Sequence, residues 1–181
     1  MMKTQSGQTN PKTIIGIDYS LTSPAICITT DFVFEKSKFY YLTSKKKYIG
    51  AMAKNITGFE HKEYDTPIRR FSQISDWVYE LIEDTIHTEQ LVFIEGYSFG
   101  SKGQAIFQIA ENCGILKYRL QQMTIDYETV VPSVVKKGAT GKGNADKDMI
   151  VVKANELVEE HSNETLSDEQ LDTLITYIEK Q

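Results

Sequence analysis

One stretch of the sequence, LVFIE at residues 91–95, decides the fold class. It is short, apolar and rich in β-branched and aromatic side chains, which is typical of a strand buried on both faces. Residues 71–86 before it carry apolar side chains at steps of three and four, the pattern of an amphipathic helix. A helix, a short loop and a buried strand in this order predict an α/β protein with a partly parallel sheet.

Working outward toward the N-terminus, three further apolar runs predict strands. They lie at residues 13–17 (TIIGI), 25–29 and 38–42, and we expect these three strands to be antiparallel. Residues 43–66 show no clear period and are expected to form a long irregular excursion.

The C-terminal half continues the alternation of helices and strands. We expect a helix over 105–120, a strand over 127–131, a basic glycine-rich loop over 134–143, a helix from Asn144 to about Glu160, and a last helix over 167–178. The chain is therefore predicted to form a five-stranded mixed sheet flanked by helices. We expect one domain over residues 13–181, preceded by a flexible leader over residues 1–12.

Composition allows a nucleic-acid partner although the net charge is −5. Residues 151–181 carry 2 Lys against 8 Asp or Glu, whereas residues 1–150 carry 18 Lys or Arg against 17 acids. A local basic surface is sufficient for phosphate binding. No apolar run is long enough to span a membrane, and Cys27 and Cys113 lie in apolar stretches, so we expect free thiols in a reduced cytoplasm.

Two of the predicted strands end in a carboxylate, Asp18 and Glu95. Acids are poor strand residues, and one at the end of a buried strand is costly unless it is paired or binds a cation. The last predicted helix adds Asp168, Glu169 and Asp172. At about 100° per residue, Asp168 and Asp172 flank its apolar stripe while Glu169 points toward solvent.

Grouped carboxylates without a matching Cys or His set fit a hard cation such as Mg²⁺ or Mn²⁺. The alternative is structural: strand-end acids are often turn residues, and acids in the first turn of a helix compensate its dipole.

The ordered set of motifs resembles the RuvC-like Holliday junction resolvases of the ribonuclease H-like superfamily, in the compact form carried by bacteriophages. The resemblance rests on five segments, which are 14–18 (IIGID), 93–97 (FIEGY), 103–120, the basic segment 132–147, and 168–173 (DEQLDT). It implies a ribonuclease H-like fold and a homodimeric endonuclease that cuts branched DNA, above all four-way junctions, in DNA recombination and repair.

The resemblance also implies the site. Two Mg²⁺ or Mn²⁺ ions would be held by Asp18, Glu95 and Asp172, with Glu169 or Asp168 as the fourth ligand. The family's last motif has two Asp three residues apart followed by Ala, whereas this chain has Glu169, Asp172 and Thr173.

Basic and aromatic residues near the predicted acids are candidates for DNA contacts. Phosphate contacts are assigned to four lysines, Lys136, Lys137, Lys142 and Lys147. Tyr97 follows Glu95 closely and could stack on an unpaired base, whereas Phe99 could equally belong to the core. Exposed faces of the helices at 70–86 and 104–121 could form the dimer.

Two other functions compete with this interpretation. Residues 16–23 (GIDYSLTS) also fit the first phosphate loop of actin-like sugar kinases, but the chain is short for two such domains and lacks a second glycine-rich phosphate loop. The second alternative is a catalytically weakened or inactive branched-DNA-binding or scaffolding module, which the altered last motif motivates. If the protein is viral, we expect it in the cytoplasm of the host cell.

Overall fold

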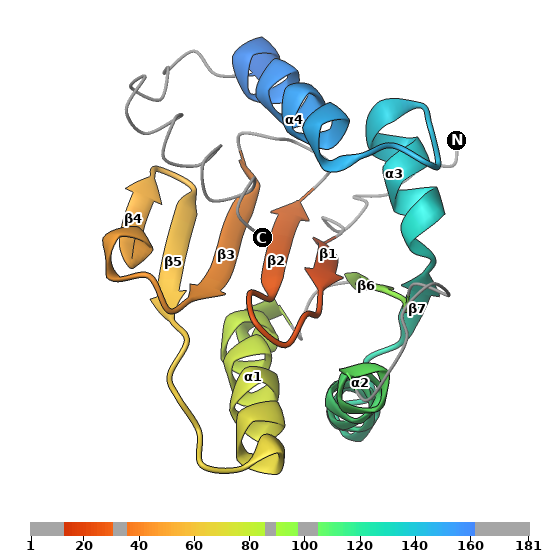
Figure 1. Cartoon of the computed structure of the whole chain (residues 1–181). Helices are drawn as coiled ribbons and strands as arrows, with labels where there is room; N and C mark the ends of the chain where they lie inside the picture. Colours follow the sequence, from red (N-terminus) through yellow and green to blue (C-terminus); the bar gives the residue numbers. More distant parts are fainter. Residues whose placement is uncertain (1–12, 31–35, 86–89, 98–104, 162–181) are drawn as a thin grey trace, which may run out of the picture.

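The computed structural model describes residues 13–30, 36–85, 90–97 and 105–161. Its centre is a seven-stranded sheet in the order β4-β5-β3-β2-β1-β6-β7 (Figure 1). The strands are β1 (Thr13–Asp18), β2 (Ala25–Thr30), β3 (Lys38–Thr43), β4 (Gly50–Ala53), β5 (Ile56–Glu60), β6 (Gln90–Glu95) and β7 (Tyr127–Val130).

The sheet is mixed, as the sequence predicts. β2 pairs antiparallel with both β1 and β3, which confirms the antiparallel arrangement of the first three strands. β6 pairs parallel with β1, β7 with β6, and β5 with β3, whereas β4 is antiparallel to β5. Five strands, β1, β3, β5, β6 and β7, therefore end on the same side, which we call the carboxyl end of the sheet.

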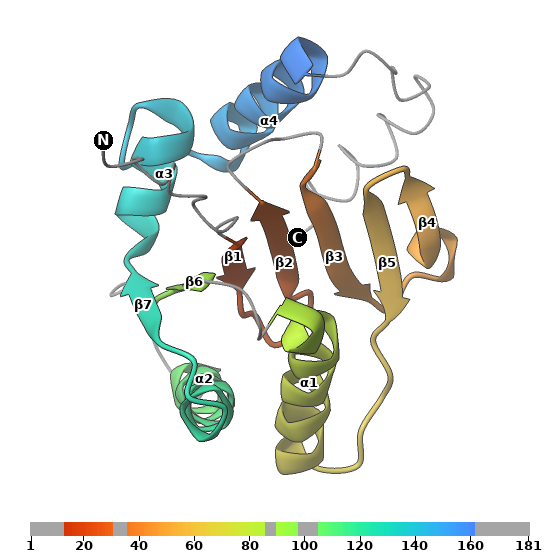
Figure 2. The ribbon, with the colours of Figure 1, turned by 180° about the vertical axis from the view of Figure 1, so that it is seen from behind.

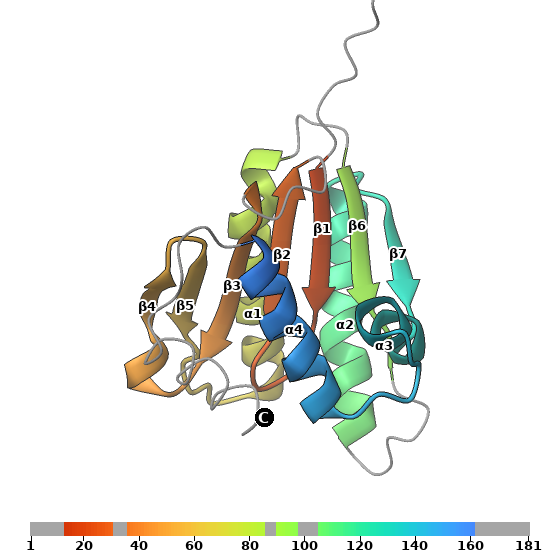
Figure 3. The same cartoon turned by 90° about the horizontal axis from the view of Figure 1, so that it is seen from above.

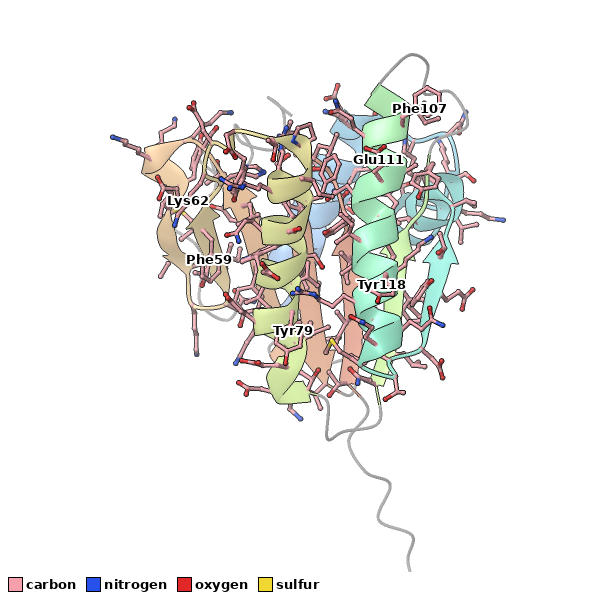
Figure 4. All side chains as sticks on the ribbon, turned by 90° about the horizontal axis from the view of Figure 1, so that it is seen from below. Phe59, Lys62, Tyr79, Phe107, Glu111 and Tyr118 are labelled. Carbon is pink, nitrogen blue, oxygen red and sulfur yellow. The ribbon has the colours of Figure 1, made fainter. Side chains whose placement is uncertain are left out.

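Helices cover both faces of the sheet. α1 (Pro67–Ile82) and α2 (Ala105–Gln122) lie side by side on one face, as Figures 1 and 4 show. α4 (Lys147–His161) lies on the opposite face, and α3 (Pro132–Thr140) follows β7 at the carboxyl end (Figure 2). Two short 3-10 turns, η2 (Lys46–Tyr48) and η3 (Glu83–Thr85), complete the described elements.

The core lies between the sheet and the α1–α2 layer. β1 contributes Ile15 and Ile17, and β6 contributes Val92 and Ile94, all at most 3% exposed. Alternate residues of these strands therefore face α1 and α2, and the residues between them face the side of α4. Asp18 and Glu95 belong to this second set.

Three sequence-based expectations about elements are wrong in detail. The sheet has seven strands rather than five, because the expected excursion over 43–66 contains β4 and β5. Their small residues, including Gly50 and Gly58, give no clear hydrophobic period, and β5 is held by its pairing with β3.

The expected loop over 134–143 is mostly helix. α3 has Pro132 in its first turn and ends at Gly141, whose φ of 77° suits a left-handed C-cap. α4 begins at Lys147 rather than near Asn144, because the Asp146 carboxylate accepts a hydrogen bond from the Met149 N–H at 2.9 Å.

Two further observations concern the described part of the chain. Cys27 and Cys113 are both free thiols, as expected. No helix among the described residues has the length and apolar character needed to cross a membrane.

Candidate functional site

Asp18 and Glu95 are brought together by the parallel pairing of β1 and β6. Ile17 is in register with Ile94, so the next residues, Asp18 and Glu95, end neighbouring strands at the same level. Both strands end at the carboxyl end of the sheet, where Figure 3 shows their arrowheads side by side. The two acids that end apolar runs in the sequence therefore lie on neighbouring strands.

The pKa values of Asp18 and Glu95 are both raised, as expected for two partly buried acids on neighbouring strands. Solvent reaches the Asp18 side chain, yet desolvation by the surrounding protein raises the pKa of its carboxyl group. Desolvation also raises the pKa of Glu95, and the negative charge of Asp18 raises it further. The ionised pair is thus destabilised by burial and by mutual repulsion, and a bound cation would relieve both.

A lysine partly compensates this negative charge. The Lys136 side chain comes from α3, and its Nζ donates a hydrogen bond to the Ala145 carbonyl oxygen at 2.9 Å. Its charge lowers the pKa of Glu95, so Lys136 lies within electrostatic reach of that carboxylate. A helix, rather than the expected glycine-rich loop, therefore carries this cation near Glu95.

Lys137, Lys142 and Lys147 are exposed around the same helix and the segment after it. The segment is tied back to α3, because the Thr140 hydroxyl lies 2.8 Å from the Lys136 carbonyl oxygen and 3.1 Å from that of Lys142. Gly143 passes close to α3, since a Cβ there would lie 3.0 Å from the Ser133 carbonyl oxygen.

Tyr97 lies two residues beyond Glu95 and is 38% exposed. Burial raises the pKa of its hydroxyl group, and the neighbouring buried thiol of Cys113 on α2 raises it further. The Lys117 Nζ lies 5.8 Å from the centre of the Tyr97 ring and 5.7 Å from that of Tyr127. The Tyr97 ring is therefore anchored against α2 while one part of it stays open to solvent.

Cys113 and Lys117 did not emerge from the sequence as site residues. They stand one helical turn apart, which places both on one face of α2. This spacing was visible in the sequence, but the position of Tyr97 against that face depends on the sheet. Phe99 lies outside the described residues.

The remaining predicted ligands, Asp168, Glu169 and Asp172, also lie outside the described residues. Within the part of the chain that the structure describes, no group of three or more His, Cys, Asp or Glu side chains could hold a metal ion. The described site is thus a pair of carboxylates with a neighbouring lysine.

Comparisons with known proteins agree with this fold. Thermus thermophilus RuvC is similar over 93% of this chain and 95% of its own, with 14% sequence identity and a TM-score of 0.55. The structure of T. thermophilus RuvC in complex with a Holliday junction substrate covers 92% of this chain and 90% of its own, with 14% identity and a TM-score of 0.58. No curated protein sequence matches the chain.

A family model settles the classification. The model described as crossover junction endodeoxyribonuclease RuvC matches residues 47–174, which is well over half of the chain. The match includes Glu95 and Lys136, and it also spans the acids of the last predicted helix. The chain belongs to the RuvC family of crossover junction endodeoxyribonucleases.

Proposed function

We propose that the protein is a divalent-metal-dependent endonuclease that hydrolyses phosphodiester bonds in branched DNA, with four-way junctions as its substrate. The observation that carries the proposal is the placement of Asp18 and Glu95 at neighbouring strand ends. The two acids lie together at the end of a mixed sheet, and the chain belongs to the RuvC family. Together these observations favour a nuclease over a sugar kinase, and a metal-binding role of the acids over a purely structural one.

The donor chemistry of the pair fits Mg²⁺ or Mn²⁺. Both ligands are carboxylate oxygens, which hard cations prefer, and burial raises both pKa values, so that a bound divalent cation would favour the ionised forms. Asp18 and Glu95 would hold the metal from the sheet, and Asp172 with Glu169 or Asp168 would complete the ligand set. When bound, such ions activate a water and stabilise the leaving oxygen of a phosphodiester.

The protein's own residues then have separate tasks. Asp18 and Glu95 must be ionised, and Lys136 favours this state of Glu95 by its positive charge. Lys137, Lys142 and Lys147 are exposed on α3, in the segment after it and at the start of α4, and are suited to hold phosphates, while Tyr97 offers a partly exposed ring for a splayed base.

A four-way junction suits this arrangement because phosphate contacts position DNA without reading its sequence. The similar T. thermophilus RuvC is described in complex with a Holliday junction substrate. Symmetric cutting of a junction requires two sites, which a two-fold homodimer would supply.

The test is cleavage of synthetic four-way junction, flap and linear duplex DNA, each with Mg²⁺, with Mn²⁺ and with a chelator. We expect metal-dependent nicking of the junction and little cutting of the linear duplex. Tight junction binding without cleavage in either metal would contradict the nuclease and favour the inactive DNA-binding module. Neither binding nor cleavage of any branched DNA would contradict both.

A further inference from the structure

A second group of lysines lies at the same end of the sheet as the two acids. The η2 turn follows β3, which ends at Thr43 on the carboxyl end of the sheet. We call Lys45, Lys46 and Lys47 the η2 lysines. Figure 3 shows this turn at one side of that end and α3, which carries Lys136, at the other, with the ends of β1 and β6 between them.

The η2 turn is held in place by a second, smaller hydrophobic cluster, which is built on the buried side chains of Tyr41 and Tyr48. Tyr48 is 2% exposed, and its carbonyl oxygen accepts a hydrogen bond from the Tyr41 hydroxyl at 2.9 Å. Gly58 on β5 lies so close that a Cβ there would be 1.9 Å from this same oxygen. The Lys47 Nζ lies 4.7 Å from the centre of the Tyr48 ring. The backbone that carries the η2 lysines is therefore pre-organised rather than a loose surface loop.

The charges around the turn leave it positive. Lys46 and Lys47 are exposed, and Lys62, in the segment after β5, adds an exposed cation toward the same end of the molecule, where Figure 4 labels it. Glu60 and Glu63 are the exposed acids next to Lys62, and the acid that follows them, Asp65, is paired with Arg69 at 2.8 Å. Among the residues that the structure describes around the turn, three exposed lysines therefore stand against two glutamates, even without the half-buried Lys45, and this balance complements a polyanion.

The spacing along the sheet suits a DNA strand or arm. β3 is two strands from β1, and β4, which the turn leads into, is four strands away. At about 4.8 Å per strand, the η2 lysines lie roughly 10–20 Å from Asp18 along the sheet. That distance corresponds to about three to six base-pair steps at about 3.4 Å each.

We propose that the η2 lysines bind the phosphates of a second arm of the branched DNA whose scissile strand lies at Asp18 and Glu95. The inference rests on the proposed function, and it adds a second contact surface on the side of the acids away from Lys136. A branched substrate would then be held on both sides of the acids, whereas a linear duplex could be held by the lysines around α3 alone.

The test compares two double variants of the full-length protein. Lys46→Gln/Lys47→Gln removes two charges of the η2 turn. Lys38→Gln/Lys54→Gln removes two exposed lysines at the opposite end of the same strands, where the Phe39 N–H donates to the Asn55 carbonyl oxygen. Binding of a four-way junction is measured in a chelator over a range of salt concentrations, and melting temperatures are measured for all variants.

We expect the Lys46→Gln/Lys47→Gln variant to show a shallower dependence of log binding constant on log salt. The slope should change by about 0.9 for each phosphate that the variant no longer neutralises, and by about 1.8 if both lysines bind phosphates. The Lys38→Gln/Lys54→Gln variant should keep the wild-type slope. The single variant Lys46→Gln preserves the contact between Lys47 and Tyr48, and it should show about half of the change.

A wild-type slope in both η2 variants, or an equal change in the control, would overturn the second contact surface. If the η2 variants give that result while the wild-type protein still binds and cuts junctions, only the second contact surface is wrong and the proposed function stands. Failure of the wild-type protein to bind any branched DNA would overturn both proposals together.

Discussion

Replacing Asp18 by Asn should abolish cleavage and at the same time make the folded protein more stable. Asp18 and Glu95 end neighbouring strands, which are about 4.8 Å apart. At that separation two negative charges repel by about 1 kcal/mol in a water-like medium and by about 3 kcal/mol at an effective dielectric constant of about 20. Because solvent reaches Asp18, we expect a gain of about 1 kcal/mol.

The sign of the pH dependence follows from the raised pKa values. Both carboxyl groups hold their protons to higher pH in the folded protein than in the unfolded chain. The folded state therefore binds more protons than the unfolded state above about pH 4, and the free energy of unfolding falls as pH rises through this window. Asp18→Asn should remove part of this decrease in the free energy of unfolding. The variant should therefore be more stable than the wild-type protein at neutral pH and equally stable in acid.

The assay is thermal and urea unfolding without divalent metal at neutral pH and at a pH of about 3.5, below the ordinary carboxyl pKa values. A gain of about 1 kcal/mol corresponds to a rise of roughly 2–4 °C for a chain of this size. Glu95→Gln should give a similar gain, and the double variant should gain less than the sum because one repulsion is counted twice. Asp126→Asn, an exposed acid just before β7, is the matched control and should leave stability unchanged.

Loss of stability in Asp18→Asn at neutral pH would refute this reasoning, because it would mean that the carboxylate makes a favourable structural interaction. Strict additivity of Asp18→Asn and Glu95→Gln would also refute it, since two acids that do not repel one another cannot form the proposed pair.

Three further predictions concern other parts of the molecule. Gly58→Ala should lower the free energy of unfolding by at least about 2 kcal/mol in urea unfolding, because its Cβ would lie 1.9 Å from a backbone oxygen; unchanged stability would mean that the η2 turn is loose. Lys136→Gln should raise the pKa of Glu95 and so shift the acid limb of the cleavage–pH profile to higher pH; an unmoved limb would separate Lys136 from the acids. Tyr97→Ala should weaken junction binding by about 1–3 kcal/mol in titrations, and unaltered binding would remove this ring from the DNA surface.

The two acids could be predicted from the sequence because each one ends an apolar run. Acids are poor strand residues, so two apolar runs that each end in one indicate a site, whereas a single strand-end acid is often a turn residue. The pairing of these two strands does not follow from the order of the elements alone, because β2 to β5 lie between β1 and β6 in the chain. The sequence could also propose Lys136 as a DNA contact. It could not place that lysine beside Glu95, because this depends on α3 packing at the end of β7.

Other features were missed for identifiable physical reasons. α3 combines Pro132, Gly138 and Gly141, which are typical of loops, yet Pro in the first turn and Gly at the C-cap are also the normal boundaries of a short helix. The strands β4 and β5 contain alanines and glycines with no alternation, so their formation is decided by tertiary pairing. The rigidity of the η2 turn depends on the close approach of Gly58 to Tyr48, and these two residues belong to different elements.

Single-turnover cleavage of a four-way junction by the wild-type protein and by Asp18→Asn, in Mg²⁺ and with binding measured in parallel, tests the central claim most directly. We predict that the wild-type protein nicks the junction only when the metal is present. The Asp18→Asn variant should bind the junction as tightly, or more tightly, and leave it uncut. Cleavage by Asp18→Asn at the wild-type rate would contradict the claim that Asp18 and Glu95 form the catalytic site.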